Sequence, residues 1–291
     1  LALSSDHFHP WNERQGQSGF AWAWLGAALQ ATPKLAYRVV CAPGQRYHPA
    51  IIAQAAATLA EMFPHRFWLT VGSGQALNEH ITGDKWPVKG DRNARLQECV
   101  EIMRALWAGQ TITHSGLVRV ETAKLYTRPE TPPPIIGAAI TAQTAEWLGG
   151  WADGLITISR PPEKLKLVVD AFRRGGGTGK PMILKVQLSY AHNEATARQQ
   201  AYEQWGTNVF KSVVMAELNT PEQFDATAEF VKLGELDERI RISADPQQHL
   251  EWLQEYIALG FDELILHNVN REQQQFIQVF GEQVLPQLAP T

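Results

Sequence analysis

The stretch LAYRVVCAPGQRYHPAIIAQAAATLAEM, residues 35–62, contains the unit from which the fold is built. Its first part, Leu35–Cys41, is apolar and β-branched, which predicts a buried strand. A polar loop with Pro and Gly follows, and Ala50–Met62 carries apolar residues at helical spacing. When such strand–helix units follow one another, the helices connect parallel strands. The stretch therefore predicts an α/β fold with a parallel sheet.

The same alternation of strand and helix extends along the whole chain. It predicts strands at Leu1–Ser4, Leu35–Cys41, Phe67–Val71, Pro134–Ala139, Gly154–Ile158, Met182–Leu188 and Glu263–His267. It predicts helices at Phe20–Gln30, Ala50–Met62, Arg92–Trp107, Thr141–Trp151, Glu163–Phe172, Glu194–Trp205, Pro246–Leu259 and Glu272–Leu285. Residues near 110–133, with a short strand-like run, and near 206–242, rich in charged helix formers, are interpreted as insertions.

The number of predicted strands favours a (β/α)8 TIM barrel. Seven strands are one short of closure, and the chain opens directly on a strand at Leu1. Because an unclosed parallel edge leaves backbone groups unpaired, we expect a further β-α unit, about 30 residues long, before Leu1. We interpret residues 1–291 as a single barrel domain without its first unit. A doubly wound open sheet is the alternative that periodicity leaves open.

Composition excludes several classes of protein. The 26 Lys and Arg against 30 Asp and Glu give a net charge of −4, and no basic run indicates nucleic-acid binding. No apolar stretch approaches the roughly 20 residues of a membrane span. The only cysteines, Cys41 and Cys99, argue against a disulfide scaffold and for a reducing, cytoplasmic location. We expect a small-molecule substrate as the partner.

Polar and small residues follow the predicted strands, where a barrel carries its active site. Asp6 and His7 follow the first strand and could supply a proton donor with an acidic neighbour. The plainer interpretation is a capped turn with a solvated histidine. Trp11 offers a wall for a planar ligand, and the small residues of Gly72–Gly74 would let a flat ring approach the backbone.

Two further motifs have simple structural interpretations. Thr141 is placed to cap a helix, whose N-terminus could hold a phosphate, although plain capping is commoner. The run Gly175–Lys180 resembles a phosphate loop, but it precedes a strand and Pro181 follows it, so we predict a flexible helix-to-strand connection. The pair His7 and His9 lacks a nearby third ligand, so we expect no metal site.

Three motifs together resemble one family. Ser5–Trp11, Arg46–Gln54 and Gly72–Glu79 follow the order and spacing of the bacterial luciferase-like superfamily of flavin and deazaflavin oxidoreductases, and the resemblance extends over nearly the whole chain. Within it, the chain resembles sugar-phosphate dehydrogenases that use the deazaflavin coenzyme F420, and resembles more nearly a subgroup of oxidoreductases that use an ordinary flavin. The resemblance implies a luciferase-like barrel with the ring at its C-terminal mouth, and a homodimer.

The resemblance also implies roles for particular residues. His7 would be the proton donor or acceptor, Gln75 would face the substrate, and Trp11 would bound the substrate pocket. Val39 and Val40 match a bulge that often holds a non-prolyl cis peptide, which costs about 3–4 kcal/mol. The implied cofactor-binding residues are Asp6, Val39, Val40, Cys41, Ser73, Gly74, Asn78, Ala138, Ala139, Ile140, Thr141 and Ser159.

Two departures from the sugar-phosphate dehydrogenases shape the functional hypothesis. Gln75 stands where they have a glutamate, and an amide does not exchange a proton at neutral pH. Arg160 stands near the place of an expected lysine. We therefore expect a substrate other than glucose 6-phosphate. We expect the protein to be a flavin-dependent oxidoreductase that uses FMN or reduced FMN, and monooxygenase chemistry is one of the reactions open to it. The alternatives are an F420-dependent dehydrogenase or reductase and a non-catalytic flavin-binding barrel.

Overall fold

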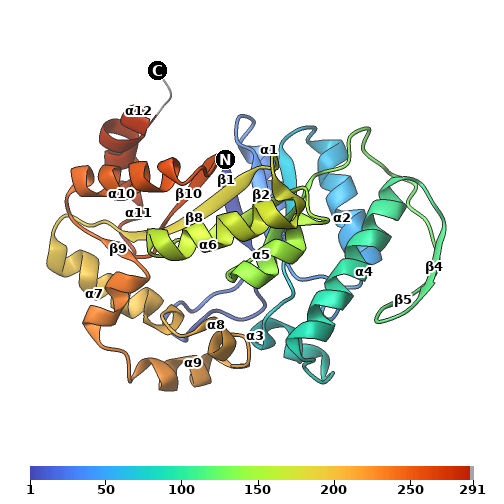
Figure 1. Cartoon of the computed structure of the whole chain (residues 1–291), viewed down its shortest axis with the longest axis horizontal. Coiled ribbons are helices and arrows are strands. Elements are labelled where there is room, and N and C mark those ends of the chain that lie inside the picture. The colour runs from blue at the N-terminus through green and yellow to red at the C-terminus, as the bar shows by residue number, and fades with distance from the viewer. Residues whose placement is uncertain (289–291) are drawn as a thin grey trace. The chain divides into compact units, whose positions relative to one another are not determined.

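The computed structural model describes residues 1–288, which form two compact units. The first unit consists of Leu1–Pro10, Gln17–Ala138 and Val213–Thr220. The second consists of Trp11–Gly16, Ala139–Ser212 and the chain from Pro221 onward. Each unit combines parallel strands with helices, as Figure 1 shows along the colour gradient of the chain.

The first unit contains four parallel strands in the order β1, β2, β3, β6. All four were predicted. Val39, Leu69 and Ile135 in β2, β3 and β6 are fully buried, which explains the continuous apolar character of these three strands, whereas β1 is only partly buried. Proline at the first position of α2 and the His48 side chain as its cap fix where that helix begins. The elements are β1 (Ala2–Ser5), α1 (Ala21–Ala31), β2 (Tyr37–Cys41), α2 (Pro49–Met62), β3 (Phe67–Val71), α3 (Ala76–Glu79), a 3-10 turn (His80–Thr82), α4 (Lys89–Trp107) and β6 (Ile135–Ala138).

The predicted insertion near 110–133 is an antiparallel hairpin. Its strands are β4 (Ile112–Ser115) and β5 (Arg119–Ala123). The sequence predicted only a strand-like run at Leu117–Val120, because the strands are largely exposed and carry few apolar residues.

The second unit is centred on the long strand β8, which pairs in parallel with β7, β9 and β10. Its principal elements are α5 (Ala142–Gly149), β7 (Gly154–Ile158), α6 (Pro162–Phe172), β8 (Met182–Ser189), α7 (Glu194–Trp205), β9 (Arg241–Ile242), α10 (Pro246–Ala258), β10 (Glu263–Asn268), α11 (Gln273–Val279) and α12 (Leu285–Leu288). The predicted last helix is interrupted by a π-helical turn at Phe280–Val284.

The insertion near 206–242 is helical, as predicted. It contains two 3-10 turns, Gly206–Asn208 and Leu233–Glu238, and the short helices α8 (Ser212–Met215) and α9 (Pro221–Ala228). It ends in β9, a strand that was not predicted because two residues are too few to show a period.

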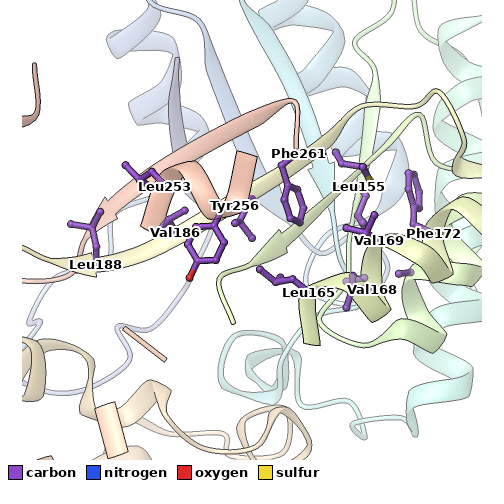
Figure 2. Close-up of a cluster of buried hydrophobic side chains, with 14 of the residues drawn as sticks. Leu155, Leu165, Val168, Val169, Phe172, Val186, Leu188, Leu253, Tyr256 and Phe261 are labelled. Carbon is purple, nitrogen blue, oxygen red and sulfur yellow. The ribbon is translucent and has the colours of Figure 1, made fainter. Parts of the chain in front are cut away.

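Alternation along β8 separates a core face from a second face. Leu184, Val186 and Leu188 belong to the hydrophobic cluster that α6 and α10 cover, with Val169 and Tyr256 among its members (Figure 2). Since successive side chains of a strand point to opposite faces, Lys185 and Gln187 lie on the face away from this cluster.

The run of glycines before β8 is a tight packing element. Arg173–Gly177 forms a π-helical turn against α5. A Cβ at Gly175 would overlap the carbonyl oxygen of Glu146, and one at Gly149 would overlap that of Phe172. The segment is the predicted helix-to-strand connection, and close backbone contact requires glycine at position 175. Within residues 1–288 no helix is both long and apolar enough to cross a membrane.

Candidate active site

The first unit gathers buried charges at the carboxyl ends of β1 and β2. Asp6 follows β1 and is only 4% exposed. Its carboxylate accepts a hydrogen bond from the Tyr47 hydroxyl at 3.2 Å and lies 3.3 Å from Nη2 of Arg46. The same Nη2 donates to the backbone carbonyl of Asp6 at 2.9 Å. Arg46 therefore holds both the side chain and the backbone of Asp6.

Arg46 also contacts a second buried carboxylate, that of Glu79 at the end of α3. The backbone N–H of Arg46 donates to Glu79 Oε2 at 3.0 Å, and Arg46 Nε lies 3.6 Å from Glu79 Oε1. Glu79 is 2% exposed. The guanidinium carbon of Arg46 lies 4.4 Å from the centroid of the Tyr47 ring. Loops that follow three strands are thus joined at a single guanidinium group.

The electrostatics of this cluster follow from burial. Desolvation raises the pKa of both Asp6 and Glu79, and the attraction of Arg46 offsets part of that rise. Burial and the neighbouring Asp6 raise the pKa of Tyr47, so its hydroxyl stays protonated and donates. Arg95 contributes a second cation through Gln45, whose Oε1 accepts from Arg95 at 3.0 Å.

Residue His7 lies between two fixed neighbours. On one side, Asp6 is held by Arg46. On the other, the Oδ1 of Asn78 accepts the backbone N–H of Phe8 at 2.9 Å and that of His9 at 3.4 Å. Nδ1 of His9 lies 2.8 Å from the carbonyl oxygen of Leu77. The short helix α3 thereby fixes the chain that carries the His7 imidazole.

The loop between β3 and α3 contains three more of the predicted residues of this unit. Ser73, Gly74 and Gln75 are partly exposed, and Gly74 has a φ of +81°, which favours glycine. The Ser73 hydroxyl accepts from Nζ of Lys89 at 2.6 Å. Gln75 precedes α3 without capping it. Among the described residues its side-chain amide has no hydrogen-bond partner, so it can bond to a ligand.

Strand β2 places its predicted residues in regular, buried backbone. Val39 and Cys41 are buried and Val40 is partly exposed. The expected cis peptide is not found: from residue 1 to residue 288 every peptide bond is trans. Burial raises the pKa of the Cys41 thiol, which therefore stays neutral. Ala138 ends β6 and is partly exposed.

The remaining predicted residues belong to the second unit. Ala139 is buried, Ile140 is 39% exposed, and Thr141 caps α5 by accepting the N–H of Thr144 at 3.3 Å. Ser159 is 3% exposed, and its hydroxyl is bonded to the side chain and backbone of Gln187, both at 3.0 Å. It therefore braces β7 against β8.

Trp11 lies among aromatic side chains of the second unit. Its ring meets those of Trp205 and Phe224 edge to face, with centroids 6.4 and 5.3 Å apart. The role of Trp11 as a wall of the substrate pocket stays a prediction. No group of three His, Cys, Asp or Glu side chains within the described chain is arranged to hold a metal ion.

Sequence reasoning missed Arg46, Tyr47 and Glu79 as site residues. All three lie inside the motifs that carry the family resemblance, yet no role was assigned to them. The available signal was the charge of Arg46 and Glu79 in the segments that follow β2 and β3, but burial of an arginine between two acids depends on residues 33 and 40 positions away.

The candidate site lies at the carboxyl ends of strands in an α/β protein. Comparison with known proteins identifies the family to which the protein belongs. Residues 2–263 match the family described as luciferase-like monooxygenase. The chain belongs to this family, and its fold is that of the luciferase-like (β/α)8 barrels. It is an oxidoreductase, as the sequence predicted.

Three known proteins show which enzymes this chain is similar to. An F420-dependent glucose-6-phosphate dehydrogenase from Microbacterium testaceum is 35% identical over 295 residues, covering 98% of this chain and 87% of the relative. The solved structure of an F420-dependent secondary alcohol dehydrogenase in complex with an F420-acetone adduct is 28% identical, with a TM-score of 0.92, and the match covers 99% of this chain and 90% of that chain. The monooxygenase RslO1 from Streptomyces bottropensis, at 20% identity and TM-score 0.74 over 99% and 88% of the two chains, shares the fold.

Proposed function

We propose that this protein is a dehydrogenase or reductase that passes a hydride between a small organic substrate and coenzyme F420. The observation that carries the proposal is the likeness to F420-dependent enzymes, in sequence at 35% identity and in structure at a TM-score of 0.92. The likeness to a monooxygenase, at 20% identity, supports the fold alone. This favours the deazaflavin over FMN, which the sequence analysis had placed first.

The residues fit an acidic, planar cofactor. The Gly72–Gln75 loop is small and partly exposed, and the ammonium group of Lys89 donates a hydrogen bond to Ser73 in that loop. Thr141 leaves the first N–H groups of α5 for other acceptors, and such a helix N-terminus suits a phosphate. When bound, the deazaflavin would supply the ring carbon that accepts or gives up the hydride.

The protein's own residues would handle the proton and the orientation of the substrate. His7 would take the hydroxyl proton from an alcohol as the hydride leaves, or return it to a carbonyl in reverse. Its backbone is fixed by Asp6 on one side and by Phe8, bonded to Asn78, on the other. Gln75 would donate a hydrogen bond to the substrate oxygen without exchanging a proton. We therefore propose an alcohol or carbonyl substrate distinct from glucose 6-phosphate.

The test is to titrate the protein separately with F420, FMN and reduced FMN while following tryptophan fluorescence. Turnover is then measured as the change in F420 absorbance with a panel of alcohols. We expect saturable F420 binding and turnover that falls about 10²-fold or more in His7→Asn, since general acid–base catalysis contributes about 10²–10⁴-fold. The exposed His192 supplies the control His192→Asn, which should keep wild-type turnover. Binding of FMN forms alone would overturn the proposal.

A further inference from the structure

A cation lies on the non-core face of β8 in the second unit. Lys185 is a charged residue in a largely apolar strand. The residues on either side of it, Leu184 and Val186, belong to the hydrophobic cluster. Its Nζ is 5.8 Å from the centroid of the Trp205 ring. That ring meets His267 of β10 edge to face, with centroids 4.8 Å apart. The register pairs Ile265 with Lys185 and His267 with Gln187, so the lysine and histidine come from adjacent strands.

Neither polar group is satisfied by the protein. Within residues 1–288 Lys185 has no hydrogen bond and no carboxylate partner, and Nδ1 of His267 is buried without a partner. Burial lowers the pKa of Lys185 to about 8, and burial together with the Lys185 charge lowers the pKa of His267 well below its ordinary value. Unpaired polar groups in low dielectric are costly, so native proteins normally satisfy them.

Aromatic rings border this pair. Trp205 lies against both members, and Trp11 meets Trp205 with its ring edge. Trp11 also packs on Phe224 of α9. Lys185, His267 and their aromatic neighbours are named the lysine subsite below. It offers a cation and an imidazole to a polar group and apolar walls to the body of a small molecule.

We propose that the lysine subsite is a binding site for a small organic carboxylate. A carboxylate balances a single ammonium charge and can accept further hydrogen bonds, here from His267. A phosphate dianion would exceed that charge, and a neutral carbonyl would leave it unbalanced.

The test is direct binding of propionate to the full chain without cofactor. Lysine labelled with ¹³C at Cε gives one NMR signal for each lysine, and Lys185→Gln identifies the signal of Lys185 by its loss. We expect propionate to shift that signal saturably, whereas its neutral isostere propionamide should not. Lys166→Gln is the matched control, because Lys166 is exposed and paired with Asp170 on α6. It should retain both the signal and its response.

His267→Asn provides a second variant in which the Lys185 signal remains. It should weaken propionate binding about tenfold, the effect of losing about 1.4 kcal/mol of interaction. Stronger binding of inorganic phosphate than of propionate would overturn the carboxylate assignment. An equal response to propionamide, or no response to any probe, would overturn the subsite itself. Since F420 is absent from these measurements, failure here is distinct from failure of the proposed hydride transfer.

Discussion

The side-chain Oδ1 of Asn78 lies 2.9 Å from the backbone nitrogen of Phe8, so α3 holds the residue that directly follows His7. Asn78 is 4% exposed, and this oxygen also accepts the N–H of His9. The resemblance assigned Asn78 to the cofactor. The structure gives its oxygen a structural role, that of positioning the proposed proton carrier.

Asn78→Ala should slow turnover and destabilise the fold. It leaves two backbone N–H groups without their acceptor, which costs about 1–3 kcal/mol for a buried group, and it loosens the chain on both sides of His7. Denaturant unfolding and the F420 turnover rate measure the two effects. Gln199→Ala, on the exposed surface of α7, should change neither. Unchanged turnover in Asn78→Ala would contradict the proposed role of Asn78 in positioning His7.

Arg46→Met should be strongly destabilising. It leaves the carboxylates of Asp6 and Glu79 buried without their cation, and breaking a buried ion pair costs about 3–5 kcal/mol. The exposed pair of Arg174 and Glu146 provides the control Arg174→Met, expected to cost about 0–1 kcal/mol. Equal losses of unfolding free energy in the two variants would show that the buried cluster contributes no more to stability than the exposed ion pair.

The stability difference between wild type and Asp6→Asn should depend on pH. Burial raises the pKa of Asp6 in the folded state above its ordinary value of 3.8. At pH values between the ordinary pKa and the raised pKa, the folded state therefore binds more protons than the unfolded state. Wild type should therefore lose stability relative to Asp6→Asn as pH rises from about 4 through the folded pKa. Unfolding at several pH values measures this. The opposite slope for Asp6 would contradict its raised pKa.

Gln75→Glu should introduce a titratable group into the β3–α3 loop. If Gln75 contacts substrate, the glutamate adds a proton acceptor, and the turnover rate with alcohols should gain a new dependence on pH near the pKa of that carboxyl. The pH profile of kcat/KM for both proteins checks this. Identical profiles would place Gln75 away from the reacting oxygen.

Gly175→Ala should cost about 1–3 kcal/mol, because its Cβ would overlap the Glu146 carbonyl and force the backbone apart. Gly26→Ala is the matched control inside α1, where nothing lies within 4 Å of the added Cβ. That substitution should stabilise by about 0.5–1 kcal/mol, since glycine is unfavourable within a helix. Thermal or denaturant unfolding distinguishes the two signs, and a neutral Gly175→Ala would mean that the turn can relax.

The strands of both units were predictable because buried parallel strands such as Phe67–Val71 are short and continuously apolar. The hairpin strand at Ile112–Ser115 and the two-residue β9 were missed, since neither carries a distinct period. Asp6 and His7 were predicted as site residues from their place after a strand. The support of Asp6 by Arg46 could not be predicted, because burial of a charge depends on tertiary contacts that a linear pattern does not contain.

The contacts of Arg46 bear on how the protein acquires its site during folding. They join residues 40 and 33 positions away, so no local segment can form the cluster by itself. Loop closure must come before the ion pairs can form, and contacts this far apart in sequence slow folding. The charged centre should therefore appear late, together with β1, β2 and β3. A chain emerging from the ribosome would have no binding-competent centre until residues beyond Glu79 were available.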